Sequence, residues 1–332
     1  MARPVIELSV RYSESKLWRS LPQARFCSTL LPYYSFGQCC QIWHMRILNH
    51  LFWHSIHALF CFALLGPVGM VLAEAPLRIA PMPMESRAVT AQAFNPLVSY
   101  LERQLGYPVE LVYFDSNDQI VKAMQDKKLD IGVMGPLPFV SLKKRGGNVE
   151  PIAFFREANG DARYRCVLVR ANSDAISPKK LRGKRIALTQ PLSTCGYLGS
   201  SAILRRYAGI TLEDMQYRYL KTHEAAALAV VSGDADIAGI KDEFAAKYSS
   251  LGLVVIAQSD PVPALSLIAN RDTLNEQQIS AIRKVLLATP ESIYRHWGHT
   301  MAHGMVPAND VDFDAFRRFG NPDAIPEYGR GK

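Results

Sequence analysis

The chain has 332 residues, of which 48% are hydrophobic and 20% are charged, a balance typical of folded globular proteins and not of disordered ones. The formal net charge is +8, and the first 73 residues carry six basic and two acidic side chains of the total. The rest carries 32 basic and 28 acidic side chains with no dense run of Lys and Arg, so we expect no nucleic-acid partner. Such a mild positive excess suits the capture of small anions.

A hydrophobic leader precedes the part of the chain with regular strand and helix patterns. Met45 and Arg46 supply a start and a positive charge, residues 58–65 are apolar, and the small residues ending at Ala73 suit a signal peptidase. We therefore expect a signal peptide over residues 45–73, cleavage after Ala73 and a periplasmic location. A membrane anchor is the rival interpretation, but polar residues, Gly and Pro interrupt the roughly 20 apolar residues that a span needs.

Residues 1–44 show no clear period and stand before an otherwise complete signal peptide. We expect translation to begin at Met45, which makes residues 1–44 a non-native upstream extension; a long, genuine n-region is the alternative. Four of the six cysteines lie before residue 74, and only Cys166 and Cys195 remain in the body. Their spacing indicates neither a zinc site nor a disulfide framework. Export to an oxidising compartment permits a disulfide between them.

From Leu77 short apolar strands alternate with helices, which predicts an α/β fold with a mainly parallel sheet. In the first series, strands are expected at residues 77–80, 109–114, 131–134 and 151–155, and helices at 96–105, 116–127 and 136–145. The first of these helices has Asn95 as N-cap and Pro96 at its first position, and it ends before Gly106.

A second series with the same alternation begins at Tyr164. Strands are expected at residues 164–169, 186–189, 217–220, 237–240, 253–257 and 265–269, and helices at 178–183, 196–207, 223–232, 276–288 and 292–303. We place a first lobe at residues 74–160 and 265–332, a second lobe at residues 161–264, and a hinge where the chain crosses between them. Ligands of such lobes bind outside the carboxyl ends of the strands, next to helix N-termini.

The strongest local signal is the turn Ser193-Thr194-Cys195-Gly196, which lies between an expected strand and an expected helix. Backbone N–H groups at a helix start are unpaired and carry the positive end of the helix dipole. Hydroxyl groups add donors, and Gly196 allows close approach to the backbone, so the turn suits an oxyanion. Ordinary N-capping by Ser193 or Thr194 explains the same residues equally well.

Other strand-end loops occupy corresponding places. His223 lies one strand–helix unit after the Ser193 turn and has a ring nitrogen that can donate to an oxyanion, although a histidine at a helix start is more often a surface residue. In the first lobe, Asn117 and Gly135 also follow expected strands. Each signal is weak alone, and their shared position at strand ends is what makes them candidates.

In order and spacing these loops resemble the phosphonate/phosphite/phosphate-type periplasmic substrate-binding proteins of ABC importers, over most of residues 77–305. The resemblance rests on residues 84–86, 101–106, 129–135, 193–197 and 222–230. It implies a two-lobed periplasmic-binding-protein fold of type II, the Venus-flytrap fold, with a hinge between the lobes. It also implies a small phosphorus oxyanion as ligand, an ABC permease in the inner membrane as partner, a monomer, and neither cofactor nor metal.

The resemblance assigns ligand contacts to residues on both lobes, namely Ser86, Asn117, Gly135, Ser193, Thr194, Cys195 and His223. Cys195 departs from the family pattern, because it puts a weak thiol donor where a hydroxyl is usual. Lys241 is a second departure. If its side chain points inward, it would pair with a fully ionised ligand and disfavour an amino-bearing phosphonate; if it points outward, it is a solvated surface residue.

Three rival functions are weighed at this point. A cofactor-precursor binder or synthase on the same scaffold would be expected to show a more aromatic or metal-ligating pocket, and neither is evident in the sequence. An enzyme could use Cys195 as a nucleophile at a helix N-terminus with His223 as base, but neither a cysteine-hydrolase signature nor an orienting third residue is identifiable. We therefore expect no enzymatic activity. A ligand-sensing domain of a signalling system would keep the same fold, but no kinase region or membrane span follows the body of the chain, which favours a transport component.

Overall fold

The computed structural model of the protein describes residues 75–173, 175–317, 322 and 325–326. The expected signal peptide with its cleavage site after Ala73, and the expected extension over residues 1–44, lie outside the described residues. Within the described part of the chain, no helix has the length and apolar character needed to cross a membrane.

A six-stranded sheet with the order β13-β4-β12-β3-β1-β2 organises the first lobe. Its strands are β1 (Leu77–Ala80), β2 (Val109–Leu111), β3 (Ile131–Met134), β4 (Val149–Phe155), β12 (Ser266–Asn270) and β13 (Met305–Pro307). Strand β1 is parallel to β2 and β3, whereas β12 is antiparallel to β3 and β4, and β13 is antiparallel to β4. The sheet is therefore mixed, and the prediction of a mainly parallel sheet was wrong. The reason is that the chain re-enters the middle of this sheet as β12 on its way back from the second lobe.

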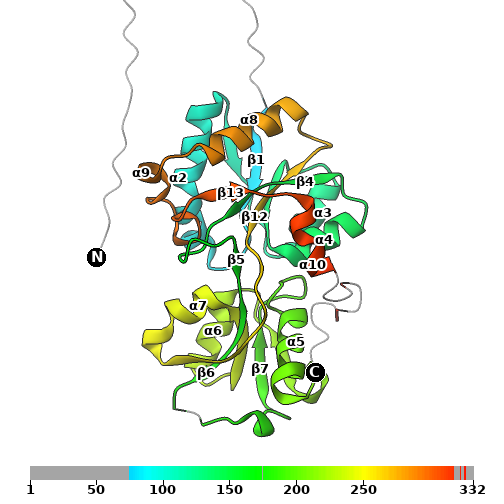
Figure 1. Ribbon diagram of the computed structural model, residues 1–332, viewed down its shortest axis with the longest axis vertical. Helices are drawn as coiled ribbons and strands as arrows, with labels where there is room; N and C mark the ends of the chain where they lie inside the picture. Colours follow the sequence, from blue (N-terminus) through cyan, green and yellow to red (C-terminus); the bar gives the residue numbers. More distant parts are fainter. Residues whose placement is uncertain (1–74, 174, 318–321, 323–324, 327–332) are drawn as a thin grey trace, which may run out of the picture. The chain divides into compact units, whose positions relative to one another are not determined.

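Helices surround this sheet (Figure 1). They are α2 (Arg87–Leu105), α3 (Asn117–Gln125), α4 (Pro136–Lys144), α8 (Glu276–Leu287), α9 (Glu291–Tyr294) and α10 (Asp314–Arg317). Helix α2 begins at Arg87 and not at Pro96, because Ser86 caps it by accepting a hydrogen bond from the Val89 N–H. Pro96 lies inside the helix, where burial of Phe94 and Leu97 outweighs the lost backbone donor.

The prediction of a helix over residues 292–303 was also wrong. The chain forms only the short helix α9 there, followed by a 3-10 turn, η4 (His299–Met301). Gly298 explains the break, because its N–H donates to the carbonyl of Ala93 on α2 at 3.1 Å. A Cβ atom on Gly298 would lie 2.4 Å from the Cβ of Ala93, so the chain turns here to pack closely against α2.

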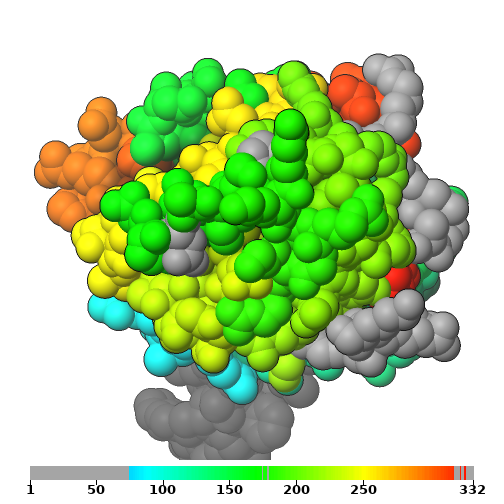
Figure 2. All heavy atoms as spheres, turned by 90° about the horizontal axis from the view of Figure 1, so that it is seen from below, coloured from blue at the N-terminus to red at the C-terminus, as the bar shows by residue number. Residues whose placement is uncertain are grey.

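The second lobe contains a five-stranded sheet with the order β10-β6-β9-β7-β8. Its strands are β6 (Cys166–Ala171), β7 (Arg185–Leu188), β8 (Gln216–Tyr219), β9 (Ile237–Lys241) and β10 (Leu253–Gln258), and its helices are α5 (Tyr197–Ala208), α6 (His223–Val231) and α7 (Asp242–Lys247). The 3-10 turns η1 (Pro178–Lys180), η2 (Leu212–Asp214) and η3 (Ser249–Leu251) complete it, and η5 (Asp310–Phe313) lies near the end of the first lobe. Figure 2 views the second lobe from below, where residues coloured green to yellow make up most of the surface.

The chain passes twice between the two sheets, and these two crossings pair with each other. Strand β5 (Arg163–Tyr164) on the outward crossing is antiparallel to β11 (Val262–Pro263) on the return crossing. Strand β5 is labelled at the crossing in Figure 1. This two-stranded ribbon lies close to the expected crossings near residues 160 and 265.

Candidate functional site

The starts of helices from both lobes meet where the two lobes contact each other. In the first lobe, the N–H of Asn117 at the start of α3 donates to Oε1 of Gln190 at 2.7 Å. The N–H of Leu137 in the first turn of α4 donates to Oγ1 of Thr194 at 3.2 Å. Both acceptors belong to the second lobe. N–H groups at a helix start have no intrahelical partner, so oxygen atoms of the opposite lobe satisfy them here.

At the start of helix α6 the N–H donors belong to the second lobe and the acceptor oxygen belongs to the first lobe. The N–H groups of His223 and Glu224 both donate to the carbonyl oxygen of Met84, at 3.1 and 3.3 Å. Met84 lies in the first lobe, in the loop between β1 and α2. The border between the lobes is therefore rich in N–H donors from helix starts, and each of these donors faces an oxygen atom.

The turn before α5 carries two buried hydroxyl groups with different surroundings. Oγ1 of Thr194 accepts the Leu137 N–H, and the Thr194 side chain also bonds to the hydroxyl of Tyr164. Burial raises the pKa of Tyr164, so this phenol stays protonated. Oγ of Ser193 is buried and has no hydrogen-bond partner among the described residues. Gly196 is the N-cap of α5 and supplies no side-chain cap; in the first turn of this helix the N–H of Gly199 donates to the backbone carbonyl of Thr194 at 3.1 Å.

Cys195 forms a disulfide with Cys166, the first residue of β6. The prediction of a weak thiol donor at position 195 was wrong, because a disulfide sulfur carries no hydrogen. The same bond removes the free thiolate that a Cys195 nucleophile would require. What remains for ligand contact is the backbone N–H of Cys195, whose carbonyl is held by a hydrogen bond from Oγ of Ser200 at 3.0 Å.

His223 is a buried residue, with 3% of its surface exposed, and not a surface histidine. Its Nδ1 atom accepts a hydrogen bond from the backbone N–H of Lys241 at 3.0 Å, and its ring stacks on Phe244 with ring centroids 5.0 Å apart. Burial, together with the nearby charge of Lys241, lowers the pKa of His223 to about 3. The ring is therefore neutral, with its proton on Nε2, and it can serve as a donor but not as a cation.

Lys241 points inward, but two carboxylates already neutralise it. Its Nζ atom lies 2.8 Å from Oε2 of Glu157 and 2.6 Å from Oε2 of Glu243, and its side chain is 2% exposed. Burial alone would lower the pKa of Lys241, but attraction to Glu243 and Glu157 outweighs burial and raises it. Of the two expected alternatives, the inward orientation is the one observed, and Lys241 is not a solvated surface residue. Its charge is already balanced by Glu157 and Glu243.

Glu243 connects this buried ion pair to the first lobe. Its Oε1 atom lies 2.9 Å from Nε2 of His299 and accepts a hydrogen bond from Thr300 at 3.2 Å. Burial alone would raise the pKa of Glu243, but the bonds from His299 and Lys241 lower it. The sequence analysis missed Glu157 and Glu243, although both acids stand next to expected strand ends, because nothing local indicates which cation they meet.

The three first-lobe candidates contact second-lobe residues. The N–H of Ser86 donates to Oε2 of Glu224 at 3.1 Å. The side chain of Asn117 donates to the carbonyl of Leu192 at 3.1 Å. Gly135 is the N-cap of α4, and a Cβ atom there would lie 3.1 Å from Oγ1 of Thr194. These contacts place Ser86, Asn117 and Gly135 at the border between the lobes.

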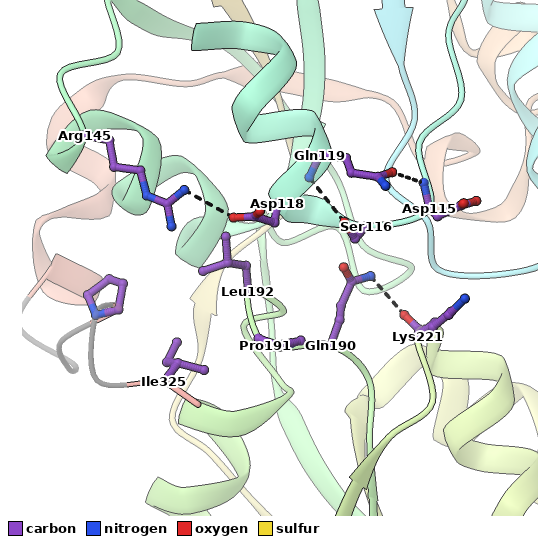
Figure 3. Close-up of a pocket in the computed structure, with 11 residues that line it drawn as sticks. Asp115, Ser116, Asp118, Gln119, Arg145, Gln190, Pro191, Leu192, Lys221 and Ile325 are labelled. Carbon is purple, nitrogen blue, oxygen red and sulfur yellow. Dashed lines mark hydrogen bonds and ion pairs between the residues drawn. The ribbon is translucent and has the colours of Figure 1, made fainter. Parts of the chain in front are cut away.

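Gln190 is a border residue that the sequence analysis missed. Besides accepting the N–H of Asn117, its Nε2 atom donates to the carbonyl of Lys221 at 2.9 Å (Figure 3). Lys221 has a φ of 72°, a strained value for a residue with a side chain, and its own N–H donates to the carbonyl of Thr189 at 2.7 Å. Gln190 thus holds the start of α3 and a strained loop together.

Two cavities lie beside this contact. The larger has a volume of about 610 Å³ and the smaller about 120 Å³, and Lys221 and Asp115 line both. Figure 3 shows the larger cavity with side chains from both lobes around it, including Asp118, Arg145 and Leu192. Both cavities are therefore lined by residues of both lobes.

A fold of two α/β lobes joined by a paired double crossing, with helix-start donors gathered between the lobes, defines a substrate-binding protein of the two-lobed periplasmic type. A model of the family described as ABC transporter, phosphonate, periplasmic substrate-binding protein matches residues 79–313. The chain belongs to this family. It is a periplasmic binding component of an ABC importer, and nothing supports the signalling or enzyme alternatives.

Individual relatives agree with this assignment. Phosphate-import protein PhnD of Mycolicibacterium smegmatis is 25% identical over 270 residues, which cover 73% of this chain and 84% of that protein. A binding protein component of an ABC phosphonate transporter from Pseudomonas aeruginosa has a TM-score of 0.67 at 19% identity, covering 74% and 86% of the two chains. PhnD1 from Prochlorococcus marinus, solved in complex with methylphosphonate, has a TM-score of 0.65 at 18% identity, covering 74% and 96%. The two structural similarities confirm the predicted two-lobed fold.

Proposed function

We propose that the protein captures a small phosphorus oxyanion, namely a phosphonate, phosphite or phosphate, between its lobes and delivers it to an ABC permease in the inner membrane. The observation that carries the proposal is the pairing of helix-start N–H groups with oxygen atoms of the opposite lobe. Gln190, Thr194 and Met84 supply those oxygen atoms in this structure. A tetrahedral oxyanion offers three or four acceptor oxygens in one small volume, which suits such convergent donors.

The remaining candidate donors support the same ligand class. Ser193 has a buried hydroxyl without a partner, and His223 is a neutral donor through Nε2. The cation of Lys241 is already balanced by Glu157 and Glu243. Binding would therefore depend on N–H and hydroxyl dipoles more than on a free positive charge. Hydrogen bonds to a charged acceptor contribute roughly 1.5–3 kcal/mol each, so a few of them suffice for tight binding.

The ligand-binding set that we propose contains Ser86, Asn117, Gly135, Ser193, Thr194, His223 and the backbone of Cys195, with Lys241 as the buried cation behind His223. We further propose a monomer that binds no nucleic acid and performs no catalysis, as its membership of a binding-protein family suggests. The lobe boundaries at residues 74–160 with 265–332 and at 161–264, and the signal peptide over residues 45–73, belong to the same proposal.

Calorimetry on the protein purified after export tests this function. Phosphate, phosphite, methylphosphonate and 2-aminoethylphosphonate are titrated separately, with sulfate as a tetrahedral control that lacks phosphorus. At least one phosphorus compound should bind more tightly than sulfate. The variant Ser193→Ala with Thr194→Ala should bind that compound at least tenfold more weakly while unfolding cooperatively. Absence of binding by all four compounds, or unchanged affinity in the double variant, would contradict the proposed ligand class or the proposed site, respectively.

A further inference from the structure

A second unpaired hydroxyl lies beside the start of α5. Oγ1 of Thr189, the residue after β7, is buried without a hydrogen-bond partner among the described residues, and the residue is 1% exposed. More than nine in ten buried polar groups in folded proteins have a partner, so an unpaired hydroxyl at this depth calls for a physical reason.

The position of Thr189 relative to Gly196 supplies such a reason. A Cβ atom built on Gly196 would lie 3.1 Å from Oγ1 of Thr189, so this hydroxyl lies against the N-cap residue of α5. Gly196 itself provides no side-chain cap. The disulfide leaves Cys195 without a side-chain donor in the same turn. Two unpaired hydroxyls, those of Thr189 and Ser193, therefore belong to the short segment that leads into one helix start.

We infer that Thr189 is a further ligand-binding residue, whose hydroxyl donates to an oxygen of the bound oxyanion at the start of α5. The inference rests on the proposed function, because it assigns a new contact in the same site. The backbone of Thr189 is already fixed, since its carbonyl accepts the N–H of the strained residue Lys221 at 2.7 Å. The backbone that carries the hydroxyl is therefore ordered before any ligand arrives, which reduces the entropy lost on binding.

A single substitution at Thr189 can distinguish a ligand-binding role of this hydroxyl from a purely structural role. Thr189→Val preserves the shape of the side chain and removes only the unpaired polar atom. Without ligand, that change should leave the thermal midpoint unchanged or raise it, because a buried hydroxyl without a partner is unfavourable. A ligand contact instead predicts weaker binding. Affinity should thus fall while the thermal midpoint stays the same or rises, a combination that a general loss of structure cannot produce.

The experiment compares three single variants with the wild-type protein, using inorganic phosphate and methylphosphonate as separate probes in calorimetry. Thr189→Val should bind the probe that the wild type binds at least tenfold more weakly, and Thr189→Ser, which keeps the hydroxyl, should stay within threefold of the wild type. Ser141→Ala is the matched control, because Ser141 in helix α4 has an equally buried and unpartnered hydroxyl elsewhere in the protein. Its affinity should not change.

Wild-type affinity in Thr189→Val would overturn the inference, and so would an equal loss in Thr189→Val and Thr189→Ser. If the valine variant does not fold, Thr189→Ala is compared with Thr189→Ser under the same criteria. Failure of the wild type to bind either probe or any other phosphorus oxyanion would instead refute the proposed function, and the inference with it. The two failures are therefore distinguishable from the wild-type titration alone.

Discussion

Nδ1 of His223 accepts a hydrogen bond from the backbone N–H of Lys241 at 3.0 Å, which ties the start of helix α6 to the end of strand β9. This contact fixes the imidazole tautomer, because an accepting Nδ1 leaves the proton on Nε2. His223 therefore offers the same neutral donor at any pH well above its lowered pKa of about 3. Any pH dependence of ligand affinity should reflect other groups, including the ligand itself.

Burial of neutral His223 predicts a specific loss of stability in acid. In the unfolded chain this histidine takes up a proton near its ordinary pKa of 6.5, whereas the folded protein holds its pKa at about 3. Between these values the unfolded state binds more protons, so the free energy of unfolding falls as the pH drops, by up to about 1.4 kcal/mol per pH unit. Urea denaturation between pH 7 and pH 4 should show a shallower decline in His223→Gln. Equal declines in both proteins would refute this account.

Removing the cation at Lys241 should destabilise the protein severely. Lys241→Met leaves Glu157 and Glu243 buried without their common partner, and breaking such a pair costs about 3–5 kcal/mol. Adding Glu157→Gln to the same variant should recover part of the loss, as measured by urea denaturation at pH 7. Lys122→Met is the control, because its ion pair with Asp126 is exposed to solvent and should contribute little to stability. Similar stabilities of the two methionine variants would contradict the prediction.

The disulfide between Cys166 and Cys195 should stabilise the second lobe and hold the turn before α5. Its two cysteines are 29 residues apart in sequence, and a loop of that length predicts a contribution of about 3–4 kcal/mol in the chain-entropy description. Cys166→Ala with Cys195→Ala should lower the free energy of unfolding by that order and weaken oxyanion binding. The wild type should lose comparable stability in a reductant, and the double variant should not respond. A wild type that is insensitive to full reduction would disprove the stabilising role.

The ion pair between His299 and Glu243 predicts a change at higher pH. Its hydrogen bond to Glu243 raises the pKa of His299 above 6.5, so the folded protein holds this proton more tightly than the unfolded chain does. The contribution is complete below pH 6.5 and disappears as the pH rises through the raised pKa. In ligand-free denaturation, the stability difference between wild type and His299→Gln should therefore shrink from pH 6 to pH 9. A stability difference that stays constant between pH 6 and pH 9 for His299→Gln would contradict this prediction.

Local patterns in the sequence were sufficient for most of the elements. Strand β3 (Ile131–Met134) was predicted with its observed limits, because apolar residues stand directly before Gly135 and Pro136. The start of α2 was missed because Pro96 imitates a helix start, and only packing on the sheet shows that it lies inside the helix. The direction of β12 depends on where the chain returns from the second lobe, which no local pattern records.

The candidate site likewise contains some residues that local sequence patterns could select and others that only the fold brings together. Position at a strand end was enough to select Ser193, Thr194 and His223, because the carboxyl ends of strands and the starts of helices coincide in α/β lobes. The partners of Lys241 could not be inferred, since Glu157 is distant in sequence and meets it only through the fold. Pairing of Cys166 with Cys195 likewise depends on the approach of β6 to the turn before α5.

The oxygen atoms of Gln190, Thr194 and Met84 have a consequence for how affinity should be understood. Because internal oxygen atoms already satisfy donors at these helix starts, a solute in the proposed site must displace internal acceptors before it can make its own bonds. Affinity is then the difference between two competing sets of hydrogen bonds, one intramolecular and one with the guest. A change that weakens the internal set would tighten uptake without adding any contact to the guest, so selectivity can evolve through residues that never touch it.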